Sequence, residues 1–247
     1  MLILIDNRGK KYLIKENQDF QTDQGIIPKE ELVDIKAGDC LKTHLDYEIK
    51  VVQADVNAGV DNEVVVNNVV KQAVDNFGRI DVLCNFAGGY EPRMLNVQPG
   101  IEFPDIPIDV FDWGLDVNLK GPFYFAHAVL GVMRDQKTGL IINLGSITGM
   151  EGSSVGMAYP TSKAGLMFGL TKSQAQYGAK YGIRSVCVSP GPVLTRPGMA
   201  TMKTLLGRAA EPQEIIDLIL FIASSKGQFI NGENIMIDGG RNCMWRG

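Results

Sequence analysis

The chain of 247 residues is long enough for one α/β domain, or for a smaller domain that carries an additional module. With 45% hydrophobic and 21% charged residues, its composition is that of a globular protein and excludes the disordered and collagen-like classes. The formal net charge of −4 supplies no global positive field that would attract nucleic acid or an anionic membrane surface. These properties favour small-molecule chemistry.

The first 50 residues are predicted to form a small β-rich module. Strand-like apolar runs lie at residues 2–5, 11–14 and 40–52, with turn signals at residues 7–9 and around Gly25 and Gly38. Only residues 28–35 have a helical pattern. We expect the module to end near Lys50, so that residues 1–50 and 51–247 are separate domains.

From residue 51 onward, short apolar runs alternate with longer helical patterns, which is typical of βαβ units and a parallel sheet. The predicted fold class is therefore α/β, with a doubly wound parallel sheet. The predicted strands are residues 51–55, 80–84, 140–144, 185–188 and 234–237, and the predicted helices are residues 62–77, 110–133, 160–177 and 212–224.

The sequence has no pattern typical of a metal site, a signal peptide or a membrane span. Its four cysteines and two histidines are scattered and form no CxxC pair, which predicts reduced thiols and no bound metal. The N-terminal run Met1–Asp6 is too short for a signal-peptide core and has no basic segment before it. The most apolar helical stretch, residues 215–223, is short and contains Asp217. We expect a cytoplasmic protein.

Tyr159 and Lys163 are four residues apart near a predicted helix start, so that a phenol and an ammonium share one helical face. A nearby cation favours the phenolate and brings the tyrosine pKa closer to a value useful for proton transfer. The spacing alone also fits an amphipathic helix with a solvated lysine. Ser146 follows a predicted buried strand, so its hydroxyl is expected at the carboxyl edge of the sheet, where ligands bind. Its alternative role is that of a helix cap or turn residue.

Further motifs stand in a fixed order around these residues. This order resembles the short-chain dehydrogenase/reductases over about residues 51–241. The resemblance implies a Rossmann-like sheet, NAD or NADP as cofactor, a small-molecule alcohol or carbonyl substrate, and a homo-oligomer, dimer or tetramer. The matching segments are Asp55-Val56, Asn85-Phe86-Ala87-Gly88, Asp116-Val117-Asn118-Leu119, Ser146, Tyr159 with Lys163, Pro190-Gly191-Pro192-Val193 and Ile237-Asp238-Gly239-Gly240.

The resemblance also implies a role for each matched residue. Tyr159 would be the general acid/base, and Lys163 would lower its pKa and hold the nicotinamide ribose. Ser146 would orient the carbonyl, and Asn118 would hold a proton-relay water. Without the resemblance, the asparagine fits a helix kink and the glycines fit ordinary turns. The implied cofactor contacts are Asp55 and Val56 beside the adenine, Asn85, Ala87 and Gly88 along the cofactor backbone, and Pro190, Gly191, Val193 and Thr195 against the nicotinamide.

The sequence departs from the family pattern at its start, where a strand should lead through a glycine-rich turn into a helix that binds the cofactor pyrophosphate. Residues 7–11 contain one glycine and lead into another strand-like run. The Rossmann-like sheet is thus predicted to be N-terminally incomplete, with an open strand edge, and the sequence does not distinguish NAD from NADP. A second hypothesis is a chimeric or rearranged chain whose catalytic constellation is assembled but inactive, with weak cofactor binding.

Residues 1–50 have a resemblance of their own. The segments 4–13, 22–27 and 38–44 are similar to the N-terminal domain of archaeal tRNA (adenine-N1) methyltransferases. The chain has no counterpart of that family's methyl-donor-binding domain, so methyl transfer is not implied. An RNA-associated module is a third hypothesis, against which the absence of a basic stripe with interleaved aromatic residues argues.

The segment between Gly88 and Asn118 is longer than the resemblance implies. Tyr90, Arg93 and Phe103 within it are candidates for contact with a polar or carboxylate-bearing substrate. The alternative is a surface loop without a ligand role.

Overall fold

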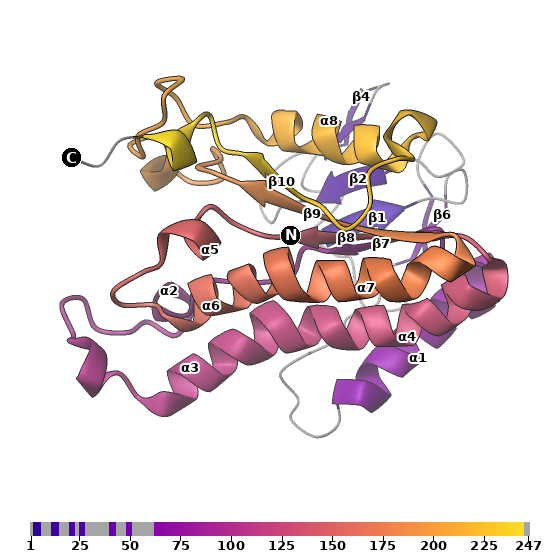
Figure 1. The fold of residues 1–247 in the computed structure, drawn as a ribbon, viewed down its shortest axis with the longest axis horizontal. Helices are drawn as coiled ribbons and strands as arrows, with labels where there is room; N and C mark the ends of the chain where they lie inside the picture. Colours follow the sequence, from indigo (N-terminus) through magenta and orange to yellow (C-terminus); the bar gives the residue numbers. More distant parts are fainter. Residues whose placement is uncertain are drawn as a thin grey trace. The chain divides into compact units, whose positions relative to one another are not determined.

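The computed structural model describes residues 62–244 and six short strands before them (Figure 1). The chain forms two compact units, Met1–Arg79 and Ile80–Gly247. The domain boundary predicted near residue 50 stays a prediction. The predicted helix at 28–35, the predicted strand at 51–55 and the candidate cofactor residues Asp55 and Val56 lie outside the described residues.

The described strands of the first unit form three antiparallel hairpins, followed by one helix. β1 (Leu2–Ile5) pairs with β2 (Lys11–Ile14), both with their predicted bounds. The run predicted at residues 40–52 is a hairpin of β5 (Cys40–Lys42) and β6 (Glu48–Lys50). The hairpin of β3 (Phe20–Thr22) and β4 (Gly25–Ile27) was not predicted, because three-residue strands are too short for an alternating pattern. The helix α1 (Asn62–Phe77) has its predicted bounds.

The second unit contains a four-stranded parallel sheet in the order β10-β9-β8-β7. This confirms the α/β class with a parallel Rossmann-like sheet. The predicted strand positions are also confirmed, with end shifts of up to two residues. The strands are β7 (Val82–Asn85), β8 (Gly139–Leu144), β9 (Ile183–Pro190) and β10 (Asn234–Ile237).

One face of the sheet packs against α8 (Pro212–Ala223) through an apolar core. Leu140 and Ile142 of β8 and Val186 and Val188 of β9 point to this face, as the two-residue period of a strand requires. The helix begins at Pro212 with a capping box, in which the backbone N–H of Glu211 donates to the Glu214 carboxylate at 2.8 Å. The core residues from α8 are Ile215, Ile219 and Ile222.

The opposite face packs against α4 (Gly121–Gln136) and α7 (Thr171–Gly178), so the sheet lies between two helical layers (Figure 1). Here buried polar groups bond to one another: the Asn143 amide donates to Thr171 Oγ1 at 2.9 Å and to Gln174 Oε1 at 2.8 Å. The Ser185 hydroxyl donates to the same Gln174 oxygen at 2.8 Å. This network fixes the register of α7 over the sheet.

Two of the predicted long helices are interrupted by π-helical turns. Residues 110–133 are divided into α3 (Ile108–Leu115), a π turn (Asp116–Lys120) and α4. Residues 160–177 are divided into α6 (Ala158–Ala164), a π turn (Gly165–Leu170) and α7. In the first π turn the backbone N–H of Gly121 donates to the carbonyl of Asp116, five residues before it.

Among the described residues, β8 is the one strand paired with β7, which therefore stands at the end of the described sheet. Within the first unit, β1 pairs with β2. An open strand edge stays a prediction, because residues 51–61 lie outside the described part of the chain.

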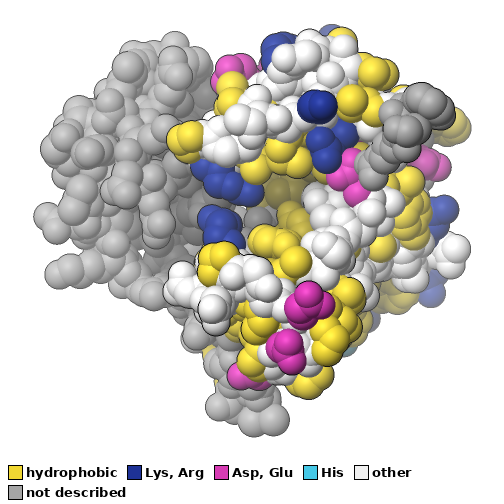
Figure 2. Space-filling view, turned by 90° about the vertical axis from the view of Figure 1, so that its left-hand side faces the viewer, with side chains coloured by type: hydrophobic (Ala, Val, Ile, Leu, Met, Phe, Trp, Pro, Cys, Tyr) yellow, Lys and Arg dark blue, Asp and Glu magenta, His cyan; other side chains and the backbone are white. Residues whose placement is uncertain are grey.

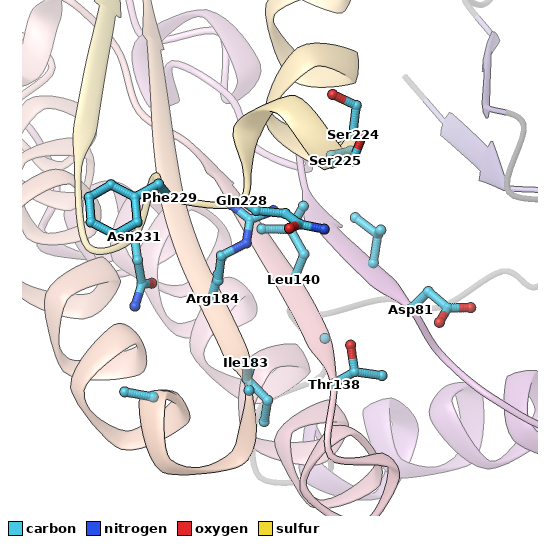
Figure 3. Close-up of a pocket in the computed structure, with 15 residues that line it drawn as sticks. Asp81, Thr138, Leu140, Ile183, Arg184, Ser224, Ser225, Gln228, Phe229 and Asn231 are labelled. Atoms are coloured by element: carbon cyan, nitrogen blue, oxygen red, sulfur yellow. The ribbon is translucent and has the colours of Figure 1, made fainter.

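A pocket of about 640 Å³ lies at the amino-terminal edge of this sheet, lined by the starts of β8 and β9 and the turn after α8 (Figure 3). Among the described residues that line it, Arg184 is the one basic side chain; it donates to the backbone carbonyls of Ile222 and Ile230 at 2.8 Å and of Gly227 at 3.0 Å. These three hydrogen bonds use donors of the guanidinium that a ligand would otherwise need. We therefore do not assign a ligand to this pocket. It lies beside the turn after α8, at the edge opposite to the one where ligands bind in such sheets.

Candidate active site

The carboxyl edge of the sheet brings the predicted catalytic residues together. Ser146 follows the end of β8, and Pro190 ends the neighbouring β9. The two strand ends are joined because the backbone N–H of Ile147 donates to the carbonyl of Pro190 at 2.9 Å. Figure 2 views the molecule from the side of α5 and α6, where a hollow has hydrophobic side chains inside it and Lys and Arg side chains beside it.

Ser146 is buried and shapes the turn after β8. Its Oγ accepts a hydrogen bond from the backbone N–H of Thr148 at 3.1 Å and lies 3.2 Å from Thr148 Oγ1. Ser146 therefore has the role of a turn residue, and its hydroxyl also acts on the Tyr159 phenol by lowering the pKa of that phenol. The short helix α5 (Thr148–Glu151) follows, and Arg241 holds its end through Nε to the Glu151 carboxylate at 2.9 Å.

Tyr159 and Lys163 both belong to α6 and share one face of it, as their spacing predicts. The Lys163 Nζ lies 5.4 Å from the centroid of the Tyr159 ring. The ammonium donates to the carbonyl oxygen of Leu144, the last residue of β8, at 2.6 Å. A lysine held in this way links α6 to the strand that precedes Ser146.

Burial perturbs the Lys163 ammonium. The side chain is 2% exposed, and this desolvation lowers its pKa from the ordinary 10.5 to about 8. Leu144 supplies one acceptor, whereas an ammonium can donate three hydrogen bonds. The remaining donor capacity is thus suited to a polar partner such as a ribose hydroxyl.

The pKa of Tyr159 is raised above its ordinary value of 10, chiefly because burial disfavours the phenolate. The hydrogen bond from Ser146 and the positive charges of Arg196 and Arg93 act in the opposite direction, while the negative charge of Glu91 adds to the increase. Desolvation outweighs the groups that stabilise the phenolate. The phenol is therefore held in its protonated form at neutral pH.

Asn118 lies in the first π turn and is fully buried. Its amide nitrogen donates to the carbonyls of Gly89 and Gly114, both at 2.9 Å, and its Oδ1 accepts from the backbone N–H of Gly89 at 3.0 Å. A Cβ on Gly88 would lie 2.6 Å from Asn118 Oδ1 and 3.6 Å from Lys163 Nζ. Gly88, Asn118 and Lys163 therefore meet at one place.

This close approach predicts the effect of a side chain at position 88. The Gly88→Ala variant is expected to lose about 1–3 kcal/mol of stability, because three hydrogen bonds prevent Asn118 from moving away from the added methyl group. Chemical denaturation measures the loss. Gly131→Ala is the control: apart from its own stretch of α4, no atom of the described residues lies within 4 Å of a Cβ on this glycine, so the change should increase stability by up to about 1 kcal/mol. Equal stability of the two variants would contradict this account.

The other candidate cofactor residues lie at the ends of the strands. Asn85 ends β7, but its amide donates to Asn143 Oδ1 at 2.9 Å and to the Pro122 carbonyl at 3.3 Å, so it is engaged within the protein. Ala87 and Gly88 are both exposed, and Gly88 lies beside Lys163. The backbone N–H of Gly191 donates to the carbonyl oxygen of Ile237 at 3.0 Å. Val193 forms an isolated parallel β-bridge with Ala210, and Thr195 is exposed.

The sequence analysis missed Glu91 as a site component and named its neighbour Tyr90 only as a candidate substrate contact. Glu91 is 1% exposed, and its Oε1 accepts from the backbone N–H groups of Ala158 at 2.8 Å and Tyr159 at 3.2 Å. The Tyr90 ring meets the Tyr159 ring edge to face, with 6.0 Å between centroids. Nothing in the local pattern identifies a buried glutamate, because glutamate next to proline is typical of an exposed helix start.

Within the described residues no group of three or more His, Cys, Asp or Glu side chains could hold a metal ion, and no helix is long and apolar enough to cross a membrane. The groups around Gly88 fit a nicotinamide ribose instead. Residues 87–88 are exposed, the Lys163 ammonium lies beside Gly88, and a glycine lets a ligand approach the backbone closely.

The comparisons with known proteins agree with this site. The family model described as enoyl-(acyl carrier protein) reductase matches residues 35–242. The 7alpha-hydroxysteroid dehydrogenase of Bacteroides fragilis is 37% identical over 66% of this chain and 65% of its own length. The 3-oxoacyl-[acyl-carrier-protein] reductase FabG of Thermotoga maritima is 34% identical over 83% of this chain and 85% of its own length.

A solved structure agrees as well. The crystal structure of gox2181 superposes with a TM-score of 0.67 at 28% identity, over 79% of this chain and 76% of that chain. Fold, site and sequence similarity thus point to one assignment. The chain belongs to the short-chain dehydrogenase/reductase family of oxidoreductases.

Proposed function

We propose that this protein is an NAD(P)-dependent oxidoreductase that interconverts a secondary alcohol and a carbonyl by hydride transfer, with Tyr159 as general acid/base. The observation that carries the proposal is the meeting of a buried lysine, a half-buried tyrosine and a serine hydroxyl at the carboxyl edge of a parallel sheet. The relatives support the reaction class, since one is named a hydroxysteroid dehydrogenase and another a 3-oxoacyl reductase.

The nicotinamide, when bound, supplies or accepts the hydride. Lys163 would hold the nicotinamide ribose, with its remaining hydrogen-bond donors turned away from Leu144. The exposed residues Ala87 and Gly88 and the loop Pro190–Thr195 would line the cofactor. The choice between NAD and NADP is left open in this proposal.

In carbonyl reduction, the Tyr159 phenol donates its proton to the carbonyl oxygen as the carbonyl carbon receives the hydride, which gives the alcohol. Ser146 donates a hydrogen bond to the same oxygen while negative charge develops on it. In the reverse direction the phenolate accepts the proton from the alcohol. The raised pKa of Tyr159 suits the first direction at neutral pH, because the proton to be donated is then present.

Cofactor binding tests the proposal most directly. Titration of the protein with NADH and with NADPH, followed by nicotinamide fluorescence, should give a saturable signal with at least one of them. The signal should be weaker in Lys163→Met, because this variant lacks the ammonium assigned to the ribose. Absence of a saturable signal with either cofactor would instead favour the second hypothesis, a chimeric chain with an assembled but inactive constellation.

Family membership also supports a homo-oligomer, dimer or tetramer, in the cytoplasm, and light scattering in solution would measure the oligomeric state. The similarity of residues 1–50 to archaeal tRNA (adenine-N1) methyltransferases stays a prediction. A gel-shift experiment with tRNA tests the associated RNA-binding hypothesis, and absence of a shift would remove it.

A further inference from the structure

The helix that carries Tyr159 lacks a cap from its own sequence. The side chain of its N-cap residue, Met157, accepts no hydrogen bond from the first backbone N–H groups. These N–H groups have no partner within the helix, and they are costly to leave unpaired when they are buried. Ala158 is fully buried, so the start of α6 needs an acceptor from elsewhere in the protein.

Glu91 supplies this acceptor from a distant part of the chain. One of its carboxylate oxygens accepts from both Ala158 and Tyr159, which follow it by 67 and 68 residues. The carboxylate lies where α3 and α6 pack most closely: a Cβ on Gly114 of α3 would meet Ala158 Cβ and lie 3.4 Å from Glu91 Cδ. A negative charge is favourable at this place, because it faces the positive end of a helix.

The residues beside Glu91 contact the same groups. Gly89 pairs through both its N–H and its carbonyl with Asn118. The Tyr90 hydroxyl accepts from the backbone N–H of Gly156 at 3.2 Å, in the turn that leads into α6. Three consecutive residues therefore join the predicted relay asparagine to the segment that presents the catalytic tyrosine.

The geometry points to Glu91 as a positioning residue: its buried carboxylate caps α6 and, with Gly89 and Tyr90, fixes the Tyr159 phenol relative to Asn118. This inference rests on the proposed function for its meaning in catalysis, but the contacts themselves do not depend on it. Glu91 belongs to the segment that follows Gly88. This segment would act on Tyr159 through the backbone at the start of α6, and this action requires no contact with the substrate.

Glu91 acts on Tyr159 in two ways, by geometry and by charge. Tyr159 is faced by Ser146 from the turn after β8, by Lys163 from its own helix, by Arg196 from the loop after β9, and by Arg93 and Glu91 from α2 (Glu91–Met94). Among these charged groups Glu91 is the one whose charge opposes phenolate formation. A substitution that keeps the acceptor but removes the charge therefore lowers the pKa of Tyr159.

Three variants test the inference. Glu91→Gln keeps a carbonyl oxygen for the cap and removes the charge, whereas Glu91→Ala removes both. Glu214→Gln is the matched control, because Glu214 also accepts from a backbone N–H at the start of a helix, α8, which packs on the opposite face of the sheet. The ionisation of Tyr159 is measured as the ultraviolet titration of each protein minus that of the same protein carrying Tyr159→Phe, which requires no turnover.

We expect the Tyr159 titration midpoint to move to lower pH in Glu91→Gln and to stay unchanged in Glu214→Gln. In Glu91→Ala we expect kcat to fall by about 10- to 100-fold with a much smaller change in KM, because a misplaced proton donor slows the reaction more than it weakens binding. Partial restoration of kcat in Glu91→Gln supports the cap. An unchanged midpoint in Glu91→Gln, or an unchanged kcat in a folded Glu91→Ala variant, overturns the inference.

The two proposals fail in different ways. A wild-type protein that turns over no alcohol or carbonyl with NAD(H) or NADP(H) contradicts the proposed function, while the titration of Tyr159 still reports on Glu91. If Glu91→Ala does not fold, Glu91→Gln alone decides: a lowered midpoint supports the positioning role and an unchanged one overturns it.

Discussion

The Tyr159→Phe variant is expected to lose turnover by about a thousandfold or more while it binds cofactor as the wild type does. Phenylalanine keeps the ring and its edge-to-face contact with Tyr90, but it has no proton to donate to the carbonyl oxygen. General acid/base groups typically contribute 10²–10⁴-fold to a rate, so loss of the single assigned donor should remove about this factor. Steady-state kinetics with a reactive carbonyl substrate, alongside nicotinamide fluorescence, measures both quantities.

Tyr177→Phe is the control for this experiment, because Tyr177 is 42% exposed on α7 and has no assigned role. Its turnover should equal that of the wild type. Wild-type turnover in Tyr159→Phe would refute the role assigned to the phenol and would direct attention to Ser146.

The second large effect is expected at Lys163, where function and stability should change in opposite directions. The Lys163→Met variant should lose turnover and bind cofactor more weakly, because the ribose contact and the charge beside the tyrosine ring are removed. It should also gain stability relative to the wild type at neutral pH, since methionine fills a similar volume without a charge to bury.

The sign of this stability effect follows from proton binding. The folded-state pKa of about 8 lies below the ordinary 10.5, so the unfolded chain binds more protons between these values. Wild-type stability therefore rises with pH across this interval, and below about pH 8 the buried ammonium costs about 3 kcal/mol. The stability difference between Lys163→Met and the wild type should shrink by about 2 kcal/mol from about pH 7 to about pH 9.5.

Chemical denaturation at several pH values measures this difference, and the pH dependence is the informative quantity. The hydrogen bond to Leu144 is stronger from the ammonium than from the neutral amine, and this pH dependence is already contained in the folded-state pKa of Lys163. Lys172→Met, at an exposed position on α7, controls for the removal of a lysine as such. A difference between Lys163→Met and wild type that does not vary with pH would mean that Lys163 is not desolvated in solution.

The sequence predicts the sheet of the second unit well, because its strands are buried apolar runs that are bounded by turn residues. β10 has its predicted bounds, and the other strands differ by up to two residues. The pairing of Tyr159 with Lys163 on one helical face also follows from spacing alone. The hairpin β3–β4 was missed because its strands are too short for a period to be recognised.

Features that depend on tertiary contacts could not be predicted from local pattern. The cap of α6 comes from Glu91, 67 residues before Ala158, and a glutamate beside a proline gives no local sign of burial. Asn85 appeared as a cofactor contact in the family resemblance, but its amide is engaged by Asn143 of the neighbouring strand. The raised pKa of Tyr159 likewise reflects desolvation, which no residue spacing reveals.

The π turns at residues 116–120 and 165–170 carry a consequence for how this protein tolerates change. Each extra residue in a helix rotates the following side chains by about 100°. Lys163 can therefore lie beside Gly88 and bond to the end of β8, while Thr171, which follows the second π turn, bonds to Asn143 within the sheet. Deleting one residue from either turn would restore a regular helix. The core residues after the turn would then be rotated by about 100° relative to the site residues before it, so that both sets could not keep their contacts. In each of these interrupted helices, the π turn thus sets the direction of the site residues separately from that of the core residues.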